Sequence, residues 1–243
     1  MSRKPSTSPG PDELPALQSY TGLRMGIAIV AFLFPFALWF GGRLRGIERQ
    51  HSLSAYFHAV TPGGFGTMHD VFVETLLVIA AFLYLYKGYT TLENRVLNAA
   101  GIFAAGVAVI PMPWPDTGQK LSLHGVLAAA FFFCIAFVCI VCAQTTLRFI
   151  RRQGVRRRFL FVYQTLGIAM IALPAIAWLW GARHGVSHDV FLAEASAVMT
   201  FALYWAVKTY ELWGVEAVRL HLRDARGEAP VHEVLSATYG CVP

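Results

Sequence analysis

Histidine and carboxylate side chains cluster around the starts of three apolar segments in this 243-residue chain. Six of the eight histidines lie in or beside alternate polar links: His51, His58, His69, His124, His184 and His188. Acidic residues accompany them: Asp70, Glu74, Asp116, Asp189 and Glu194. Neutral imidazole is the commonest metal ligand in proteins, and a neighbouring carboxylate orients its second nitrogen. Three converging histidines with one open position would form a catalytic zinc site, which lowers the pKa of the bound water to about 7.

Structural roles compete with this interpretation at several positions. Asp70 and Asp189 stand where helices are expected to begin, and either is favoured there as an N-cap by the helix dipole. His51 and His184 suit ordinary polar loops. The same alternative places four other side chains in a buried hydrogen-bond network that ties helices together: His58, His124, Glu74 and Glu194. The residue types leave both interpretations open.

Six apolar segments of bilayer length must position these side chains. The chain is 56% hydrophobic and 14% charged, whereas about a quarter of the residues of a soluble domain are charged. Runs of about 17–25 apolar residues predict transmembrane helices at 25–42, 68–87, 95–112, 123–145, 159–181 and 190–212. The third is the weakest, because Pro111 and Pro113 crowd its end. The second and sixth reach full length only if Lys87 and Lys208 snorkel to the interface. The predicted fold is an all-α polytopic bundle of six transmembrane helices.

The distribution of basic residues predicts the orientation of this bundle. The segments on one side hold fifteen Lys and Arg and those on the alternate side hold five, so both termini are expected in the cytoplasm. Residues 1–20 are polar and rich in Ser and Pro, which predicts a disordered cytoplasmic tail. A six-helix domain at 21–213 and a cytoplasmic C-terminal tail at 214–243 follow. The net charge of +6 needs no nucleic acid to explain it, because basic clusters can face anionic lipid headgroups.

Two details of the links and helices bear on the site. The outer link at 43–67 is the longest, and its length suits a lid, a re-entrant turn or a short interfacial helix. The third apolar segment is rich in small residues, which predicts close helix packing at the centre of the bundle: Ala99, Ala100, Gly101, Ala104, Ala105 and Gly106.

The stretch Ser54-Ala-Tyr-Phe-His58, followed by Asp70 and later by His184-Gly-Val-Ser-His188, resembles the signature of the alkaline ceramidase and progestin/adipoQ receptor superfamily of membrane hydrolases. That resemblance implies zinc held by His58, His184 and His188, with Ser54 and Asp70 beside the metal-bound water. It also implies hydrolysis of a lipid amide or ester.

A second resemblance covers most of the chain. The run from Ser52 to Pro111, which includes SLSAYFH, HDVFVETLL, LYKGY and ENRVLNAAGIFAAGVA, is similar to a family of uncharacterised bacterial inner-membrane proteins. It implies a multi-pass protein of the bacterial inner (plasma) membrane. The helix start at Leu123-His124 and an acid near Glu194 also match that family. The resemblance therefore favours His124 over His184 as the third ligand.

Three functional hypotheses follow from these patterns. The first is a metal-dependent membrane hydrolase of lipid amides or esters, in which His58, His124 and His188 bind zinc, with His184 as an alternative ligand. In it, Asp70 or Glu74 is the general base and Ser54 donates a hydrogen bond to the developing oxyanion. The second is a non-catalytic bundle that binds membrane lipid or a partner protein, whose polar cluster, Asp189 and Glu194 included, only packs helices. The third is haem binding, which the absence of histidine from the cytoplasmic half of the spans disfavours.

Overall fold

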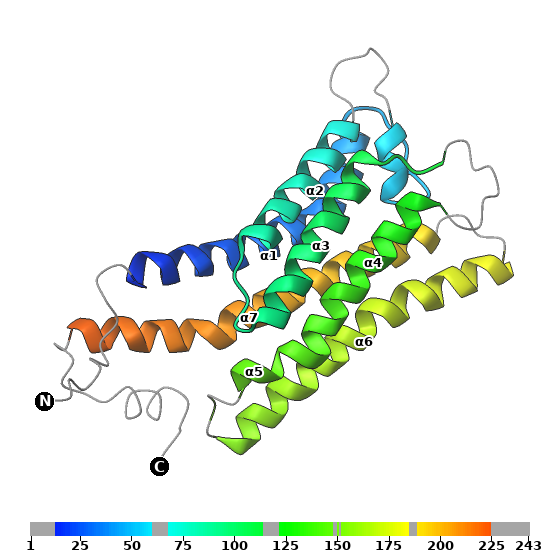
Figure 1. Cartoon of the computed structure of the whole chain (residues 1–243). Coiled ribbons are helices and arrows are strands. Elements are labelled where there is room, and N and C mark those ends of the chain that lie inside the picture. The colour runs from blue at the N-terminus through cyan, green and yellow to red at the C-terminus, as the bar shows by residue number, and fades with distance from the viewer. Residues whose placement is uncertain are drawn as a thin grey trace, which may run out of the picture.

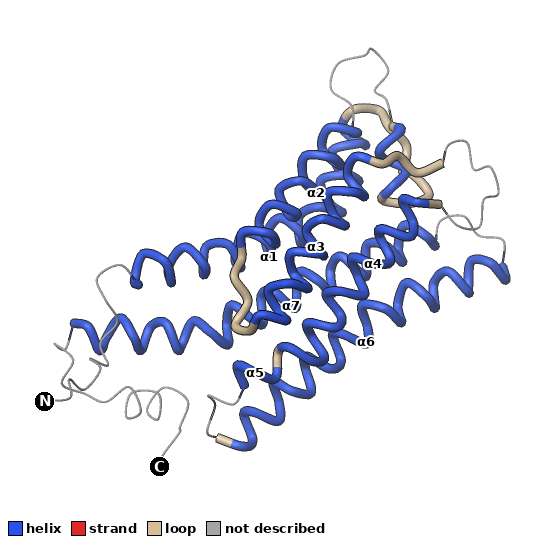
Figure 2. The backbone as a smooth tube through the Cα atoms, viewed as in Figure 1, coloured by secondary structure: helices blue, strands red, loops and turns tan. Residues whose placement is uncertain are grey.

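The computed structural model describes the backbone of residues 13–59, 68–113, 122–147, 150, 152–184 and 189–224. Side chains are described at these positions except 13–18, 177, 178, 180–182, 184, 189 and 214–224. Within these ranges every regular element is a helix, as Figure 2 shows. The α-helices are α1 (Glu13–Leu44), α2 (Met68–Leu85), α3 (Thr91–Val109), α4 (Leu123–Phe137), α5 (Gln144–Leu147), α6 (Gln153–His184) and α7 (Asp189–Asp224). A 3₁₀ helix, η1 (Ser54–His58), precedes α2, and a π-helical segment, η2 (Val138–Cys142), joins α4 to α5.

The long helices form a closed ring in chain order. Helix α1 packs on α2, α2 on α3, α3 on α4, α4 on α6, α6 on α7, and α7 returns to α1. Figure 1 shows η1 at the end of the bundle where α2, α4 and α7 begin, which we call the η1 end. The turn between α2 and α3 lies at the opposite end, together with the start of α1 and the last turns of α7. Successive helices therefore run in opposite directions through the ring.

Five helical segments are long and apolar enough to cross a membrane: Ser19–Leu44, Met68–Leu85, Leu123–Leu147, Gln153–Ile176 and Val190–Trp213. The predicted all-α membrane bundle is confirmed at this level. Helix α3 coincides with the weakest predicted span. Its first two turns carry Glu93 and Arg95, which lower its mean hydropathy.

Two features differ from the sequence-based expectation. Helix α1 begins at Glu13, so residues 13–20 are helical, whereas a disordered tail was expected over 1–20; residues 1–12 lie outside the described ranges. Pro15 falls in the first turn, where the backbone N–H that proline lacks would have no helical partner, and leucine and alanine around it favour helix. The second difference is the π-helical turn that interrupts the fourth apolar segment, in which Ala143 N donates to Val138 O at 2.9 Å.

Glycines allow the close helix packing that the small residues predict. A Cβ atom added at Gly101 would lie 2.8 Å from the carbonyl oxygen of Ala80 on α2. One added at Gly167 on α6 would lie 2.6 Å from Cγ1 of Ile140. Both distances are shorter than van der Waals contact, so these helix pairs approach closely because no side chain separates them. The predicted close packing of α3 is thereby confirmed against α2, whereas the contacts place α3 in the ring between α2 and α4.

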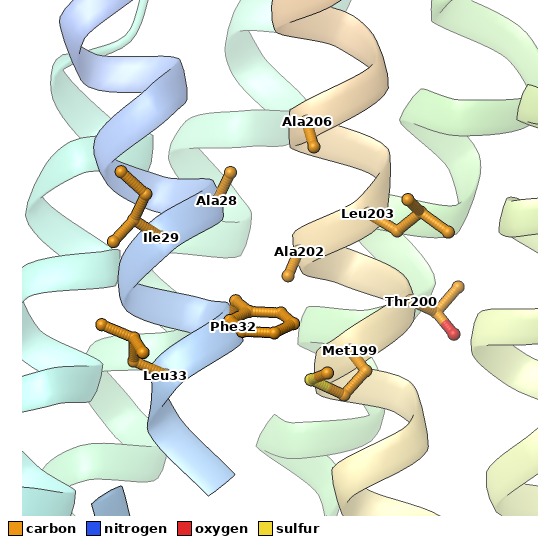
Figure 3. Close-up of a pocket in the computed structure, with 9 residues that line it drawn as sticks. All are labelled: Ala28, Ile29, Phe32, Leu33, Met199, Thr200, Ala202, Leu203 and Ala206. Atoms are coloured by element: carbon orange, nitrogen blue, oxygen red, sulfur yellow. The ribbon is translucent and has the colours of Figure 1, made fainter. Parts of the chain in front are cut away.

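An apolar groove of about 580 Å³ lies between α1 and α7, within both of their candidate spans (Figure 3). Ala28 and Phe32 of α1 and Ala202 and Ala206 of α7 are among its lining residues. Its one polar side chain is Thr200, whose hydroxyl donates to Ser196 O at 2.8 Å. The groove thus offers hydrocarbon contacts and no titratable group, so its lining contains no candidate catalytic residue.

Candidate functional site

The link after α1 folds back onto the η1 end of the bundle and carries the first site residue. Ser52 Oγ accepts a hydrogen bond from Ala55 N at 2.9 Å, which starts η1. Tyr56 in η1 is fully buried, and burial raises the pKa of its phenol. Of the three forms expected for this link, the structure shows a short helix packed against α2. Residues 60–67 lie outside the described part of the chain.

Ser54, the first residue of η1, contacts two other helices. Its Oγ lies 3.0 Å from Nε2 of His124 on α4 and 3.4 Å from Oε1 of Glu194 on α7. Its backbone N donates to Oε2 of Glu194 at 3.1 Å. The Phe72 ring of α2 stacks on the His124 imidazole, with their centroids 6.4 Å apart. A serine, a buried histidine and a glutamate, far apart in sequence, therefore form one hydrogen-bonded centre, which we call the Ser54 centre.

Two prolines direct backbone carbonyls toward the imidazoles. Proline disfavours the helical conformation in the residue before it, and α3 accordingly ends at Val109 with Ile110 extended. The Ile110 carbonyl accepts from His124 Nδ1 at 2.6 Å. Met112, which precedes Pro113, likewise accepts from His58 Nε2 at 2.8 Å. The prolines that weaken the third span as a membrane helix thus supply acceptors for two predicted ligands.

The Ile110 contact determines which nitrogen of His124 carries the proton. A carbonyl oxygen only accepts hydrogen bonds, so Nδ1 must be the donor. In the neutral imidazole Nε2 is then unprotonated, so the Ser54 hydroxyl, which has one proton and also lies 3.4 Å from Glu194 Oε1, can donate that proton to Nε2. This is the arrangement by which histidine activates a serine nucleophile, with a backbone carbonyl in the orienting position that a carboxylate often occupies.

The remaining predicted site residues lie around this centre or outside the described part. Asp70 is in the first turn of α2, exposed, with its Oδ1 3.3 Å from His69 Nδ1. Glu74, one turn further along α2, is also exposed. The Ser54 centre includes neither carboxylate. The side chains of His184 and Asp189, and the whole of His188, lie outside the described residues.

Two of the residues predicted to bind zinc, His58 and His124, have described side chains. Each of the two described ligands donates from one ring nitrogen to a backbone carbonyl, which is how ligand imidazoles are commonly oriented. Within the described side chains, no group of three His, Cys, Asp or Glu is placed to hold a metal ion. Because the third expected ligand, His188, is not among them, zinc binding stays a prediction.

Sequence reasoning missed a second polar cluster, toward the opposite end of the bundle. Lys208 is fully buried and pairs with Glu211 at 3.1 Å, so it does not snorkel as expected. Lys208 Nζ also donates to Thr146 Oγ1 at 2.6 Å, and the Tyr163 hydroxyl donates to Glu211. Glu93 of α3 is buried close enough for its charge to interact with Lys208. Charged residues within apolar runs are the signal that could have found this cluster.

The opposite-end cluster joins most of the ring. Its members come from α3, α5, α6 and α7: Glu93, Thr146, Tyr163, Lys208 and Glu211. Arg24 of α1 is buried beside it, with its guanidinium 5.9 Å from the Tyr86 ring centroid. Buried charges that carry partners are tolerated in membranes when they face the bundle interior. We assign this cluster a structural role.

Comparison of the chain with protein-family models, curated proteins and solved structures gives no match. The two family resemblances drawn from its motifs therefore remain predictions.

Proposed function

We propose that this protein is a membrane-embedded hydrolase that cleaves an ester or amide bond of a lipid at the η1 end of the bundle. The observation that carries the proposal is the 3.0 Å contact between Ser54 Oγ and His124 Nε2, with Nδ1 held by Ile110 at 2.6 Å. Ser54 and His124 lie at the end of the bundle where α2, α4 and α7 begin. If these helices span the membrane, the pair lies near the surface of the hydrocarbon layer, at the depth of lipid ester and amide groups.

The proposed reaction follows from these contacts. Ser54 Oγ attacks the carbonyl carbon while His124 Nε2 takes its proton, and the imidazolium then gives that proton to the leaving alcohol or amine. Water, deprotonated by His124 in turn, attacks the acyl carbon; the bond to Ser54 Oγ breaks, the acid is released, and the imidazolium returns its proton to Oγ. Glu194 accepts from the Ser54 backbone N–H at 3.1 Å, and it acts as a positioning residue that holds η1 against α7. Ser54 is thus the nucleophile here, in place of the oxyanion role expected from the sequence.

A serine-reactive fluorophosphonate probe tests the proposal on the full chain in mild detergent. The wild type should label covalently and Ser54→Ala should not. His124→Ala should label more slowly by about 100-fold or more, the contribution of a general base. Ser19→Ala is the matched control, since that exposed serine lies in α1 at the end of the bundle opposite η1 and should leave labelling unchanged. A folded wild type that does not label, or equal labelling of Ser54→Ala, would refute the nucleophile role.

Zinc-dependent hydrolysis is the second candidate, supported by the two imidazoles that backbone carbonyls orient. Elemental mass spectrometry of the purified protein, beside a variant with His58, His124 and His188 changed to Ala, separates the two mechanisms. Stoichiometric zinc that the variant loses, with no fluorophosphonate labelling, would favour the metal mechanism. Neither zinc nor labelling would leave the non-catalytic lipid- or partner-binding bundle as the better account.

The proposal also includes the finer topology. We propose that α3 crosses the membrane as a sixth span, because it packs between α2 and α4 in the ring and runs the full course between the two ends. With six spans both termini lie on one side, and the excess of basic residues there supports the cytoplasm of a bacterial inner membrane. The η1 end then faces outward.

A further inference from the structure

A small polar pocket lies beside the Ser54 centre, where α1 ends. It has a volume of about 380 Å³ and is lined by Trp39, Arg43, Gly46, Ile47, Glu48 and Arg49. The chain turns sharply here because Gly46 adopts a φ of 74°, a left-handed conformation that glycine takes without steric cost. The turn places basic residues from α1 and from the following link around one hollow.

The described lining of the pocket carries an excess of positive charge. Arg43 and Arg49 are both exposed, and within the described part of the chain neither forms an ion pair with a carboxylate. Glu48 contributes the one acidic side chain of the lining, so the formal net charge is positive. Arg43, Arg45 and Arg49 are also three of the five basic residues on the side of the bundle with fewer of them. A concentration of arginine on the side that the charge rule depletes calls for a functional cause.

The chemistry of the lining suits a phosphate group at the membrane surface. Two guanidinium groups bind phosphate oxygens through paired, charge-assisted hydrogen bonds. Trp39 lies one turn before the end of the candidate span Ser19–Leu44, at the headgroup level where tryptophan is enriched. The pocket therefore combines an anion-binding edge with an aromatic wall at the depth of lipid headgroups.

Aromatic contacts connect this pocket to the Ser54 centre. The Arg49 guanidinium lies 5.8 Å from the Phe191 ring centroid, and the Phe191 ring lies 6.4 Å from that of Tyr56 in η1. Phe191 precedes Glu194 by one turn of α7, and Glu194 holds Ser54. A lipid whose headgroup occupies the pocket would thus have its glycerol region beside η1.

We propose that this pocket binds the phosphate of an anionic phospholipid. Resting on the proposed function, the inference further identifies the substrate as such a lipid, whose acyl ester reaches Ser54 while Arg43 and Arg49 hold its headgroup. Selectivity would then come from charge at the pocket, and the neutral bundle surface would contribute only hydrocarbon contacts.

Native mass spectrometry of the full chain in mild detergent tests the pocket separately from the chemistry. The Ser54→Ala variant is titrated with phosphatidylglycerol and with phosphatidylcholine, so that no turnover occurs. We expect at least tenfold tighter binding of the first phosphatidylglycerol molecule. Arg43→Gln/Arg49→Gln should weaken that binding about tenfold, the loss of two charge-assisted contacts. Arg156→Gln/Arg157→Gln removes the same number of charges near the start of α6, at the end of the bundle away from η1. This variant should alter the binding less than twofold. Arg43→Lys/Arg49→Lys should retain part of the preference.

The outcomes are distinct. Equal binding of the two lipids, or an equal loss in both double-glutamine variants, would overturn the proposal. If inorganic phosphate at constant ionic strength binds this pocket and phosphatidylglycerol gains nothing over phosphatidylcholine, the ligand is free phosphate and the lipid assignment is wrong. Failure of fluorophosphonate labelling with lipid preference retained would refute the serine nucleophile and leave the pocket intact. Labelling without lipid preference would do the reverse.

Discussion

At the scale of single residues, direction of proton donation decides what the Ser54 centre can do. His124 donates from Nδ1 to a carbonyl that only accepts, and this leaves Nε2 to face Ser54. A rotated ring would present the protonated nitrogen to the serine and could not remove its proton. The tautomer is therefore set by Ile110, a residue that contributes only its backbone.

Glu194 provides a prediction at this scale. Glu194→Ala removes the acceptor of the Ser54 N–H, and an unpaired buried donor costs about 1–3 kcal/mol. We expect fluorophosphonate labelling to slow by more than the loss of thermal stability explains, because η1 loses its anchor on α7. Glu194→Gln keeps one carbonyl oxygen and should label faster than Glu194→Ala. Equal rates for the two variants would contradict the positioning role.

Lys208 provides a second prediction at the scale of single residues. Lys208→Met leaves Glu211 and Glu93 buried without their cation, and breaking one partner from a buried ion pair costs about 3–5 kcal/mol. We expect a clear fall in the unfolding temperature in detergent, measured by fluorescence-detected size exclusion after heating. Lys87→Met changes an exposed lysine near the same end and should shift stability by less than about 0.5 kcal/mol. Similar effects from both substitutions would show that the buried pair is not stabilising.

At the scale of elements, the packing of α3 is set by residues that lack side chains. Gly101 lets the backbone of α3 approach Ala80 O on α2, and Gly106 accommodates Leu127 of α4. Pro111 then stops the helix and turns Ile110 toward His124. The same helix thus determines both the spacing of its neighbours and the orientation of the catalytic imidazole.

Substitution of Gly101 tests this arrangement. Gly101→Ala places a Cβ 2.8 Å from Ala80 O, so α2 and α3 must separate, and overpacking of this kind costs about 1–3 kcal/mol. Gly22→Ala is the control, because nothing lies within 4 Å of its added Cβ and alanine favours helix. We expect thermal unfolding to occur at lower temperature in the first variant and at the same or higher temperature in the second. No difference between them would contradict the close approach.

At the scale of the whole molecule, the closed ring of six helices assembles each of the two polar clusters, one at each end, from residues far apart in the sequence. Because each helix packs on its neighbour in sequence and α7 returns to α1, the starts of α2, α4 and α7 lie around η1 at one end of the bundle. A ring of six alternating helices places the first and last helices with their free ends on the same side, as Figure 1 shows for the start of α1 and the last turns of α7.

Reporter fusions test the six-span topology. Alkaline phosphatase, active only outside the cytoplasm, should be active when fused after residue 113 and inactive after residue 88. A green fluorescent protein fused to the C-terminus should fluoresce, since the chain is expected to end in the cytoplasm. Inactivity of the phosphatase at both internal positions would show that α3 does not cross and would reverse the orientation of every later helix.

Local patterns in the sequence determine much of this protein. Hydropathy predicts five of the six spans, and it predicts the bounds of α3, the remaining one, within a few residues. It does so because burial in hydrocarbon requires long apolar runs. Thr90 and Ser122 cap α3 and α4, and prolines end α3. Each of these effects depends on residues within about one turn of one another, so each is legible in the chain.

The tertiary structure alone decides which of the predicted site residues come together. Ser54, His124 and Glu194 meet because α4 and α7 have particular rotations about their axes and η1 folds inward, and these contacts span separations of 70 and 140 residues. Asp70 and Glu74 sit at equally suitable places in the sequence, but they lie on an exposed face of α2. The sequence predicts that Lys208 reaches the membrane interface, whereas in the structure it is buried beside Glu211, Thr146 and Glu93. Hydropathy records how deep a residue lies, whereas the rotation of its helix determines what it faces.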